Sequence, residues 1–136
     1  MVKLTEDIKN DLKKVRLVPL ATSSPAGEPN VAAMGVFVLQ DDDETFWFVD
    51  NFMQKTLKNL KENPKAAFYI WSPDTAGAYQ IKCAVTDIIN DGPMLAKAKA
   101  MAEAFRPGLP TKGLVIMKVL EVYSIAPGPT AGKKLL

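Results

Sequence analysis

Apolar and polar residues alternate with a strand-like period over most of the chain, and with a helical period in three short stretches. Residues 5–14 predict an amphipathic helix, because Ile8, Leu12 and Val15 fall at positions i, i+4 and i+7. The same criteria predict helices over 51–64 and 94–105, and strands over 16–22, 30–40, 45–50, 65–71, 79–89 and 114–126.

The order of these elements favours an antiparallel sheet. Turn-forming residues at 23–29 and 41–44 join the first three strands by loops of hairpin length. Parallel pairing would need crossover helices between most strands, and the predicted order does not provide them. Six strands with only three short helices therefore indicate a mainly β protein, built as a closed or partly closed barrel.

The composition excludes several kinds of chemistry. The 136 residues, 48% hydrophobic and 24% charged, predict one globular domain over 1–136. The chain has no histidine, which excludes a Ser-His-Asp or Cys-His catalytic unit and imidazole metal ligands. Its single cysteine, Cys83, excludes an intrachain disulfide, and we expect that side chain to be buried as a small apolar group. No metal site is predicted, and no side chain is assigned as a catalytic acid or base.

The charge and the ends of the chain bear on partners and location. A net charge of +2 is spread along the sequence, so we expect no nucleic-acid partner and only a weak preference for small anions. No stretch is long and apolar enough for a membrane span, so we expect no membrane partner. The charged residues 1–14 lack the apolar core of a secretory signal, which predicts a cytoplasmic protein.

Two segments are candidates for ligand binding. Lys55 and Thr56 begin a predicted helix directly after a strand and a short loop, and a helix N-terminus with a lysine and a hydroxyl suits a phosphate. The alternative is a solvated row of lysines on that helix. The small residues of 29–35 would let a flat group lie against a strand, although tight packing of the strand against a helix is the better explanation of this segment taken alone.

Taken together, these segments resemble the pyridoxamine 5'-phosphate oxidase-like superfamily of FMN-binding split barrels. The resemblance covers about residues 5–128 and is closest to the small FMN-binding proteins of the superfamily. It rests on the order and spacing of four segments: LVPLATSSPAGEPNVAAMG, FVDNFMQKTLKNLKENPKAAF, YQIKCAVTDI and LVIMKVLEVYSIAPG. The fold implied by the resemblance is a six-stranded antiparallel split β-barrel with flanking helices.

The resemblance also implies a cofactor and a set of binding residues. It implies FMN, held noncovalently at the interface of a homodimer. The ring edge would lie along Asn30, Val31, Ala32, Ala33 and Met34; the ribityl chain and phosphate would be held by Asp50, Asn51, Gln54, Lys55 and Thr56; Lys82 would reach the phosphate or ring; and Trp71 and the tail 127–133 would come from the partner subunit. Cys83 stands where relatives often have glycine.

The function implied is that of a flavin-dependent oxidoreductase or an electron-transfer flavoprotein, with NAD(P)H or another electron donor. The chain has only two arginines, Arg16 and Arg106, and no histidine, which argues against the oxidase activity that gives the superfamily its name. The alternatives are a non-catalytic flavin carrier or regulatory module, a deazaflavin-using relative, and a haem protein, which the lack of histidine disfavours.

Overall fold

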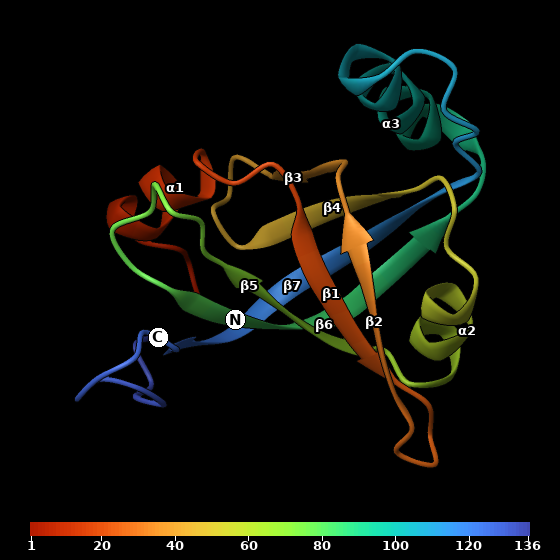
Figure 1. The fold of residues 1–136 in the computed structure, drawn as a ribbon. Helices are drawn as coiled ribbons and strands as arrows, with labels where there is room; N and C mark the ends of the chain where they lie inside the picture. Colours follow the sequence, from red (N-terminus) through yellow and green to blue (C-terminus); the bar gives the residue numbers. More distant parts are fainter.

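The computed structural model describes residues 1–136 and contains three helices and seven strands (Figure 1). In chain order these are α1 (Glu6–Leu12), β1 (Val18–Ser23), β2 (Pro29–Met34), β3 (Phe37–Leu39), β4 (Thr45–Asp50), α2 (Lys55–Glu62), β5 (Lys65–Ile70), β6 (Tyr79–Ile89), α3 (Gly92–Phe105) and β7 (Gly113–Ser124). None of the three helices has the length and apolar character needed to cross a membrane.

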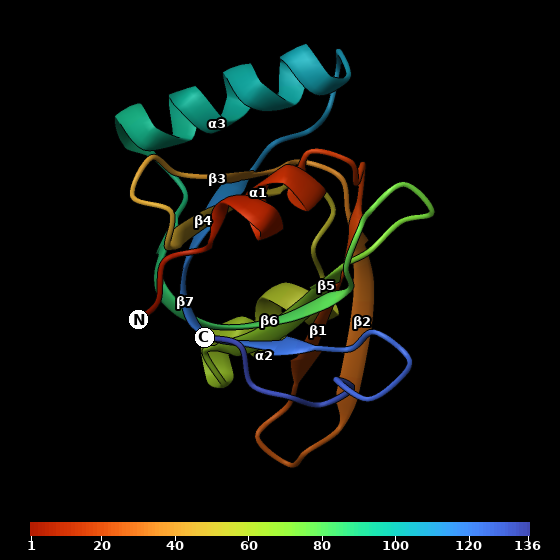
Figure 2. The same cartoon turned by 90° about the vertical axis from the view of Figure 1, so that its left-hand side faces the viewer.

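All seven strands belong to one antiparallel sheet, in the order β2-β1-β5-β6-β7-β4-β3. The sheet curls around a central core, and viewed along its axis it leaves a gap between the two edge strands (Figure 2). These edge strands, β2 and β3, are consecutive in the chain but lie at opposite ends of the strand order. The predicted mainly β, antiparallel split barrel with flanking helices is therefore confirmed.

The strand count differs from the prediction by one. The apolar run 30–40, predicted as one strand, is divided into β2 and β3 at Gly35 and Val36. The first part of this run, β2, pairs with β1, and the second part, β3, pairs with β4 at the other end of the sheet. One continuous strand could not reach both partners. The division is therefore what opens the barrel between its two edges.

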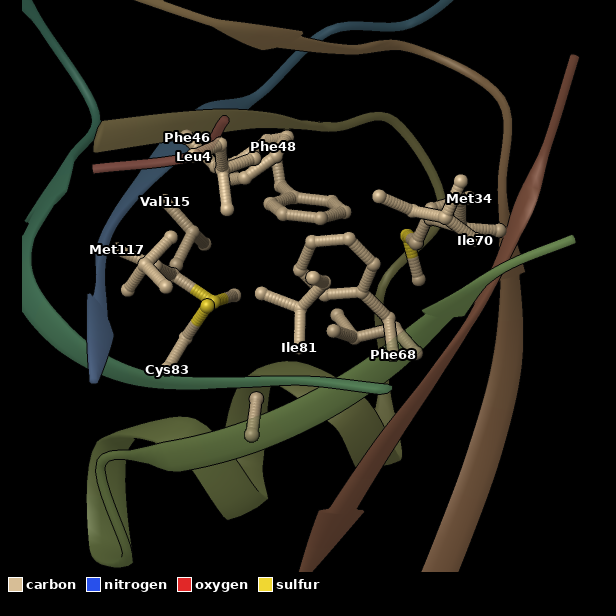
Figure 3. Packing of buried hydrophobic residues seen from close by; sticks show 14 of the residues in the cluster. Leu4, Met34, Phe46, Phe48, Phe68, Ile70, Ile81, Cys83, Val115 and Met117 are labelled. Carbon is tan, nitrogen blue, oxygen red and sulfur yellow. The ribbon is translucent and has the colours of Figure 1, made fainter. Parts of the chain in front are cut away.

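Aromatic and aliphatic side chains fill the inside of the curled sheet (Figure 3). Phe46 meets Phe68 edge to face, with ring centroids 5.0 Å apart, and Phe48 meets Phe68 at 5.3 Å. Ile81 and Cys83 point into the same core from β6, as their alternation with polar neighbours predicts. Edge-to-face contacts add to the stability that burial of these rings provides.

The helices pack around this barrel. A second, smaller apolar cluster forms where Ala98 and Ala102 of α3 meet Val49 and Leu114 of the sheet. Helix α2 lies on the outside of β1 and β2. Helix α1 is fastened by its buried Asp11, whose two carboxylate oxygens accept hydrogen bonds from the backbone N–H groups of residues 76 and 77, each 2.9 Å long.

Candidate functional site

A groove of about 430 Å³ runs along edge strand β2. Its second wall is the loop between β4 and α2 with the first turn of α2, and its third is the C-terminal end of α3 with the segment after it. Its volume falls in the range of small-molecule sites, about 300–1,000 Å³. The groove is lined by Asn30, Val31, Ala32, Ala33, Met34, Gly35, Val36, Val49, Asn51, Phe52, Met53, Gln54, Lys55, Thr56, Phe105, Arg106 and Leu109.

The start of α2 gives one end of the groove its electrostatic character. Gln54 stands at the N-cap position, no side chain caps the helix, and the first turn carries no acidic residue. The first N–H groups of a helix have no partner within it and carry a partial positive charge. The exposed Lys55 makes no ion pair and adds a full positive charge at the same place. This end of the groove is therefore suited to an anion.

A buried hydrogen-bond network joins α2 to the two strands beneath it. The side-chain amide of Asn30 donates to Thr56 Oγ1 over 3.1 Å and to Thr22 Oγ1 over 3.4 Å. Asn59, one helical turn after Thr56, donates to the same Thr22 oxygen over 3.0 Å. Thr22, Thr56 and Asn59 are buried. The network therefore links β1, β2 and α2 directly below the anion-favouring end of the groove.

The directions of these bonds determine what the groove presents to a ligand. Asn30 donates both of its amide hydrogens to threonines, which leaves its Oδ1 as an acceptor. Thr56 Oγ1 accepts one of these hydrogens, so its own hydroxyl hydrogen remains available for donation. A hydroxyl donor and an amide acceptor thus stand side by side, which suits a phosphate next to a hydroxylated chain.

A second set of contacts holds the loop between β4 and α2. Asp50 Oδ1 accepts a hydrogen bond from the Met53 N–H over 2.9 Å, and Lys112 Nζ donates to the Met53 carbonyl over 2.7 Å. Thr111 donates to Asn51 Oδ1 over 2.6 Å. Burial raises the pKa of Asp50, against the lowering effect of the Met53 N–H and of Lys112. These contacts fix the loop that brings Asn51 to the groove.

The structure brings most of the residues implied by the resemblance into this one groove. Of the twelve, three stand elsewhere in this chain. Asp50 is only 2% exposed and lies behind the loop, bonded to it. Lys82 is exposed on the outer face of β6, with its Nζ 5.7 Å from the ring centroid of Tyr123. Trp71, 52% exposed, follows β5 on the outside of the barrel.

Sequence reasoning missed the third wall of the groove. Phe105 and Arg106 stand where α3 ends, and Leu109 follows in the segment 106–113, for which the sequence pattern predicts neither a helix nor a strand. A Cβ placed on Gly35 would come within 3.2 Å of Phe105 Cζ, so that ring lies directly against the strand division. The signal in the sequence was the aromatic–arginine pair at a helix end, but its partner Gly35 is 70 residues away.

An exposed apolar surface continues from the groove across the outer face of the sheet. It is formed by Val31 on β2, Tyr69 on β5, and Leu17 and Trp71 next to strand ends, with exposed fractions of 66%, 41%, 55% and 52%. The residues between them are small, and Ala21 lies directly between Val31 and Ala67 in the register. Exposed apolar patches of this kind mark interaction surfaces. We call these four residues the outer apolar face.

The only thiol of the chain does not contribute reactivity. Cys83 is 1% exposed among core side chains, and burial raises its pKa to about 12. A thiol that stays protonated at neutral pH is a poor nucleophile. The structure also holds no cluster of three His, Cys, Asp or Glu side chains that could bind a metal ion.

Comparison with known sequences gives a family and a relative. A sequence model described as pyridoxamine 5'-phosphate oxidase matches residues 4–126. The uncharacterized protein MJ0282 of Methanocaldococcus jannaschii is 40% identical over 138 aligned positions, which cover 98% of this chain and 88% of that protein. Both matches span β1 to β7 and the groove between them.

Comparison with solved structures gives the same fold with several ligands. HupZ of Group A Streptococcus superposes with a TM-score of 0.78, at 26% identity, over 95% of this chain and 99% of that one. An FMN-binding protein from Syntrophomonas wolfei superposes with a TM-score of 0.75, at 19% identity, over 89% and 90%. An F420 reductase and HutZ, the haem storage protein from Vibrio cholerae, each have a TM-score of 0.67, at 22% and 16% identity, covering 88% and 90% of this chain and 98% and 95% of theirs. The fold is thus shared by proteins with different cofactors.

Proposed function

The chain belongs to the pyridoxamine 5'-phosphate oxidase family, and on that basis we propose that it is an FMN-binding flavoprotein that works as a homodimer. The observation that carries the proposal is the groove along β2, where an uncapped helix start with Lys55 and Thr56 adjoins a strand of small residues. FMN combines a phosphate with a flat ring, and the groove offers a separate, suitable surface for each.

The phosphate end of the cofactor fits the start of α2. The first N–H groups of the helix, the Lys55 ammonium and the Thr56 hydroxyl all offer hydrogens at one place, and a phosphate offers only acceptor oxygens. The free Oδ1 of Asn30 beside Thr56 would accept from a ribityl hydroxyl. Asn51 and Gln54 line the groove next to them, held there by the contacts of the β4–α2 loop.

The ring fits the rest of the groove. Ala32 and Ala33 leave the β2 backbone open to close approach, and β2 is an edge strand whose outward N–H and C=O groups have no strand partner. Val31 belongs both to the groove and to the outer apolar face, so a second subunit on that face would cover the open side of the ring. In that arrangement Trp71 of one protomer would approach the groove of the other, which accounts for its distance from the groove of its own chain.

Bound flavin would supply hydride or single-electron transfer, and the residues of this chain would bind and orient it. Lys55 and the start of α2 would anchor the phosphate, while β2 would present backbone groups to the ring edge. No carboxylate, thiol or imidazole of this chain lines the groove, and we assign none of its side chains to proton transfer. We propose a flavin-dependent oxidoreductase or electron-transfer protein.

The test is flavin binding by wild-type protein and by Lys55→Ala. Quenching of flavin fluorescence is titrated with FMN and, separately, with riboflavin, which lacks the phosphate. We expect Lys55→Ala to weaken FMN binding at least tenfold and riboflavin binding less than twofold, because only the phosphate uses the lost charge. Lys58→Ala is the matched control, one turn further along α2 and outside the groove. Equal losses for both flavins would contradict the phosphate assignment.

The same preparation separates the alternatives. A protein that retains F420 or haem but not FMN would contradict the choice of cofactor. A protein that binds FMN but is not reduced by NADH, NADPH or any other donor, and exchanges FMN freely, would be a flavin carrier. The visible spectrum of the purified protein identifies the bound cofactor, and the spectrum after each nicotinamide donor is added shows whether a bound flavin is reduced.

A further inference from the structure

A second cavity, of about 960 Å³, adjoins the flavin groove on the open side of the barrel. It lies between α1, β3 and the C-terminal end of α3, and Figure 2 shows α1 and α3 on opposite sides of β3. The two cavities share Gly35 and Phe105 as a common wall. A molecule in the second cavity would therefore be separated from the groove by one phenylalanine ring and one glycine.

The charged side chains around this cavity are three basic and three acidic groups, and they differ in whether they form ion pairs. Lys9 pairs with Glu6 over 2.7 Å and with Asp43 over 3.1 Å, so those three groups neutralise one another in part and are held in place. Lys13 and Arg16, at the C-terminal end of α1 and just beyond it, are exposed and form no ion pair.

One unpaired acidic side chain, Asp41, also lines the second cavity. Over the whole lining the three basic and three acidic side chains balance, but the two cations without an ion pair, Lys13 and Arg16, lie three residues apart at the end of α1, so this end of the cavity presents two unpaired positive charges.

The placement of the two arginines also points to an anionic ligand. The chain has only two, Arg16 and Arg106, and they line the two adjoining cavities: Arg16 the second, and Arg106 the groove, next to Phe105. The planar guanidinium binds a phosphate or carboxylate through two parallel hydrogen bonds, which a lysine cannot do. Neither arginine has an acidic partner in the structure, so both guanidinium groups are free for a ligand.

We propose that the second cavity binds a small molecule bearing a phosphate or carboxylate group, held by Arg16 and Lys13, beside the wall formed by Gly35 and Phe105. This anion would be the second reactant of the flavoprotein, and that role rests on the proposed FMN site. The anion site itself does not depend on it, because none of the residues that hold the charge belong to the groove.

The test is isothermal titration of FMN-saturated protein at low ionic strength with pyrophosphate, citrate and NADP⁺. Saturation with FMN fills the groove, so additional anion binding reports on the second cavity. We expect Arg16→Gln to weaken binding of the best of these probes at least tenfold, Arg16→Lys by less, and Lys13→Gln severalfold. Lys97→Gln, which removes an exposed and unpaired lysine of α3 outside both cavities, is expected to stay within twofold of wild type.

Each outcome bears on the proposal. No binding of any of the three anions at millimolar concentration, or equal binding by Arg16→Gln and wild type, would overturn it. Preference for citrate over pyrophosphate would identify a carboxylate ligand, and the reverse a phosphate ligand. If the protein binds no FMN, the titration is repeated on FMN-free protein carrying Lys55→Gln, and a loss on adding Arg16→Gln would then support the anion site although the proposed flavin function had failed.

Discussion

Asn30 sets the polarity of the hydrogen bonds at the phosphate end of the groove. Because its amide donates to Thr56 Oγ1 over 3.1 Å, the Thr56 hydroxyl hydrogen remains free for a ligand. Asn30→Asp keeps the size of the side chain but turns this donor into an acceptor, which would draw the hydroxyl hydrogen inward and add a negative charge beside the phosphate. We expect FMN binding to weaken by about 1.5–3 kcal/mol, at least tenfold, and riboflavin binding to change less.

The measurement is the same pair of flavin titrations, with Asn10→Asp as control. That exposed residue of α1 adds the same charge outside the groove. If Asn30→Asp binds FMN as tightly as wild type, the assigned direction of the hydrogen bond is wrong. Thr56→Ser, which keeps the hydroxyl, is expected to bind FMN nearly normally, whereas Thr56→Val is expected to behave like Asn30→Asp.

Single residues also show where sequence reasoning was limited. Lys55 and Thr56 could be identified because a helix start is a local feature, readable from a strand, a short loop and a change of period. The bond between Asn30 and Thr56 spans 26 positions, and Asn59 reaches Thr22 across 37, so neither has a local signal. Asp50 has a polar side chain that could bind a ligand, but its carboxylate instead accepts a hydrogen bond from the Met53 N–H in the loop that follows β4.

At the scale of elements, each predicted helix and strand is present in the structure, and the one difference is the division of the predicted strand 30–40 into β2 and β3. The run 30–40 has the apolar character of one strand, and nothing in its composition requires a break at Gly35. The break follows from closure of the barrel, because β2 pairs with β1 while β3 pairs with β4 at the opposite end of the sheet. The close contact of Phe105 with Gly35, which bounds both cavities, follows from the same division.

The attachment of α1 depends on the ionisation of one carboxylate. Burial alone would raise the pKa of Asp11, but the N–H groups of Ala76 and Gly77, together with Lys14, outweigh it and lower the pKa below the usual 3.8. A lowered pKa in the folded state stabilises the protein at pH values above 3.8, and this stabilisation is lost as the pH falls through the lowered value. Asp11→Asn is expected to lower the free energy of unfolding at pH 7 by about 1–3 kcal/mol.

Urea unfolding at pH 7 and at pH 3 measures this effect. The difference between wild type and Asp11→Asn should be largest at pH 7 and shrink at pH 3, because that pH lies below the ordinary pKa of 3.8 and the unfolded state then takes up a proton that the folded carboxylate binds less readily. Asp7→Asn, an exposed carboxylate of the same helix, is the control and should change the stability at pH 7 by less than about 0.5 kcal/mol. A difference that is independent of pH would show that Asp11 acts only through its shape.

At the scale of the whole molecule, the groove and the outer apolar face form one continuous surface. Val31 belongs to both, and Leu17, Tyr69 and Trp71 extend the surface across the sheet. A monomer would leave these side chains in water, with the groove open along the same side. A second copy packed on this face would bury them and complete the groove, so dimerisation and flavin binding are expected to be coupled.

Trp71→Glu tests this coupling. A tryptophan near the centre of an interface commonly contributes about 2 kcal/mol or more, so the dimer should dissociate roughly 30-fold more readily. Sedimentation at several protein concentrations measures the dimer, and flavin titrations at the same concentrations measure the groove. Since Trp71 does not line the groove of its own chain, a drop in FMN affinity that is restored at high protein concentration would come from the partner. Met94→Glu, at a 37% exposed position on α3, should alter neither measurement. A wild-type protein that stays monomeric while it binds FMN would contradict the coupled dimer.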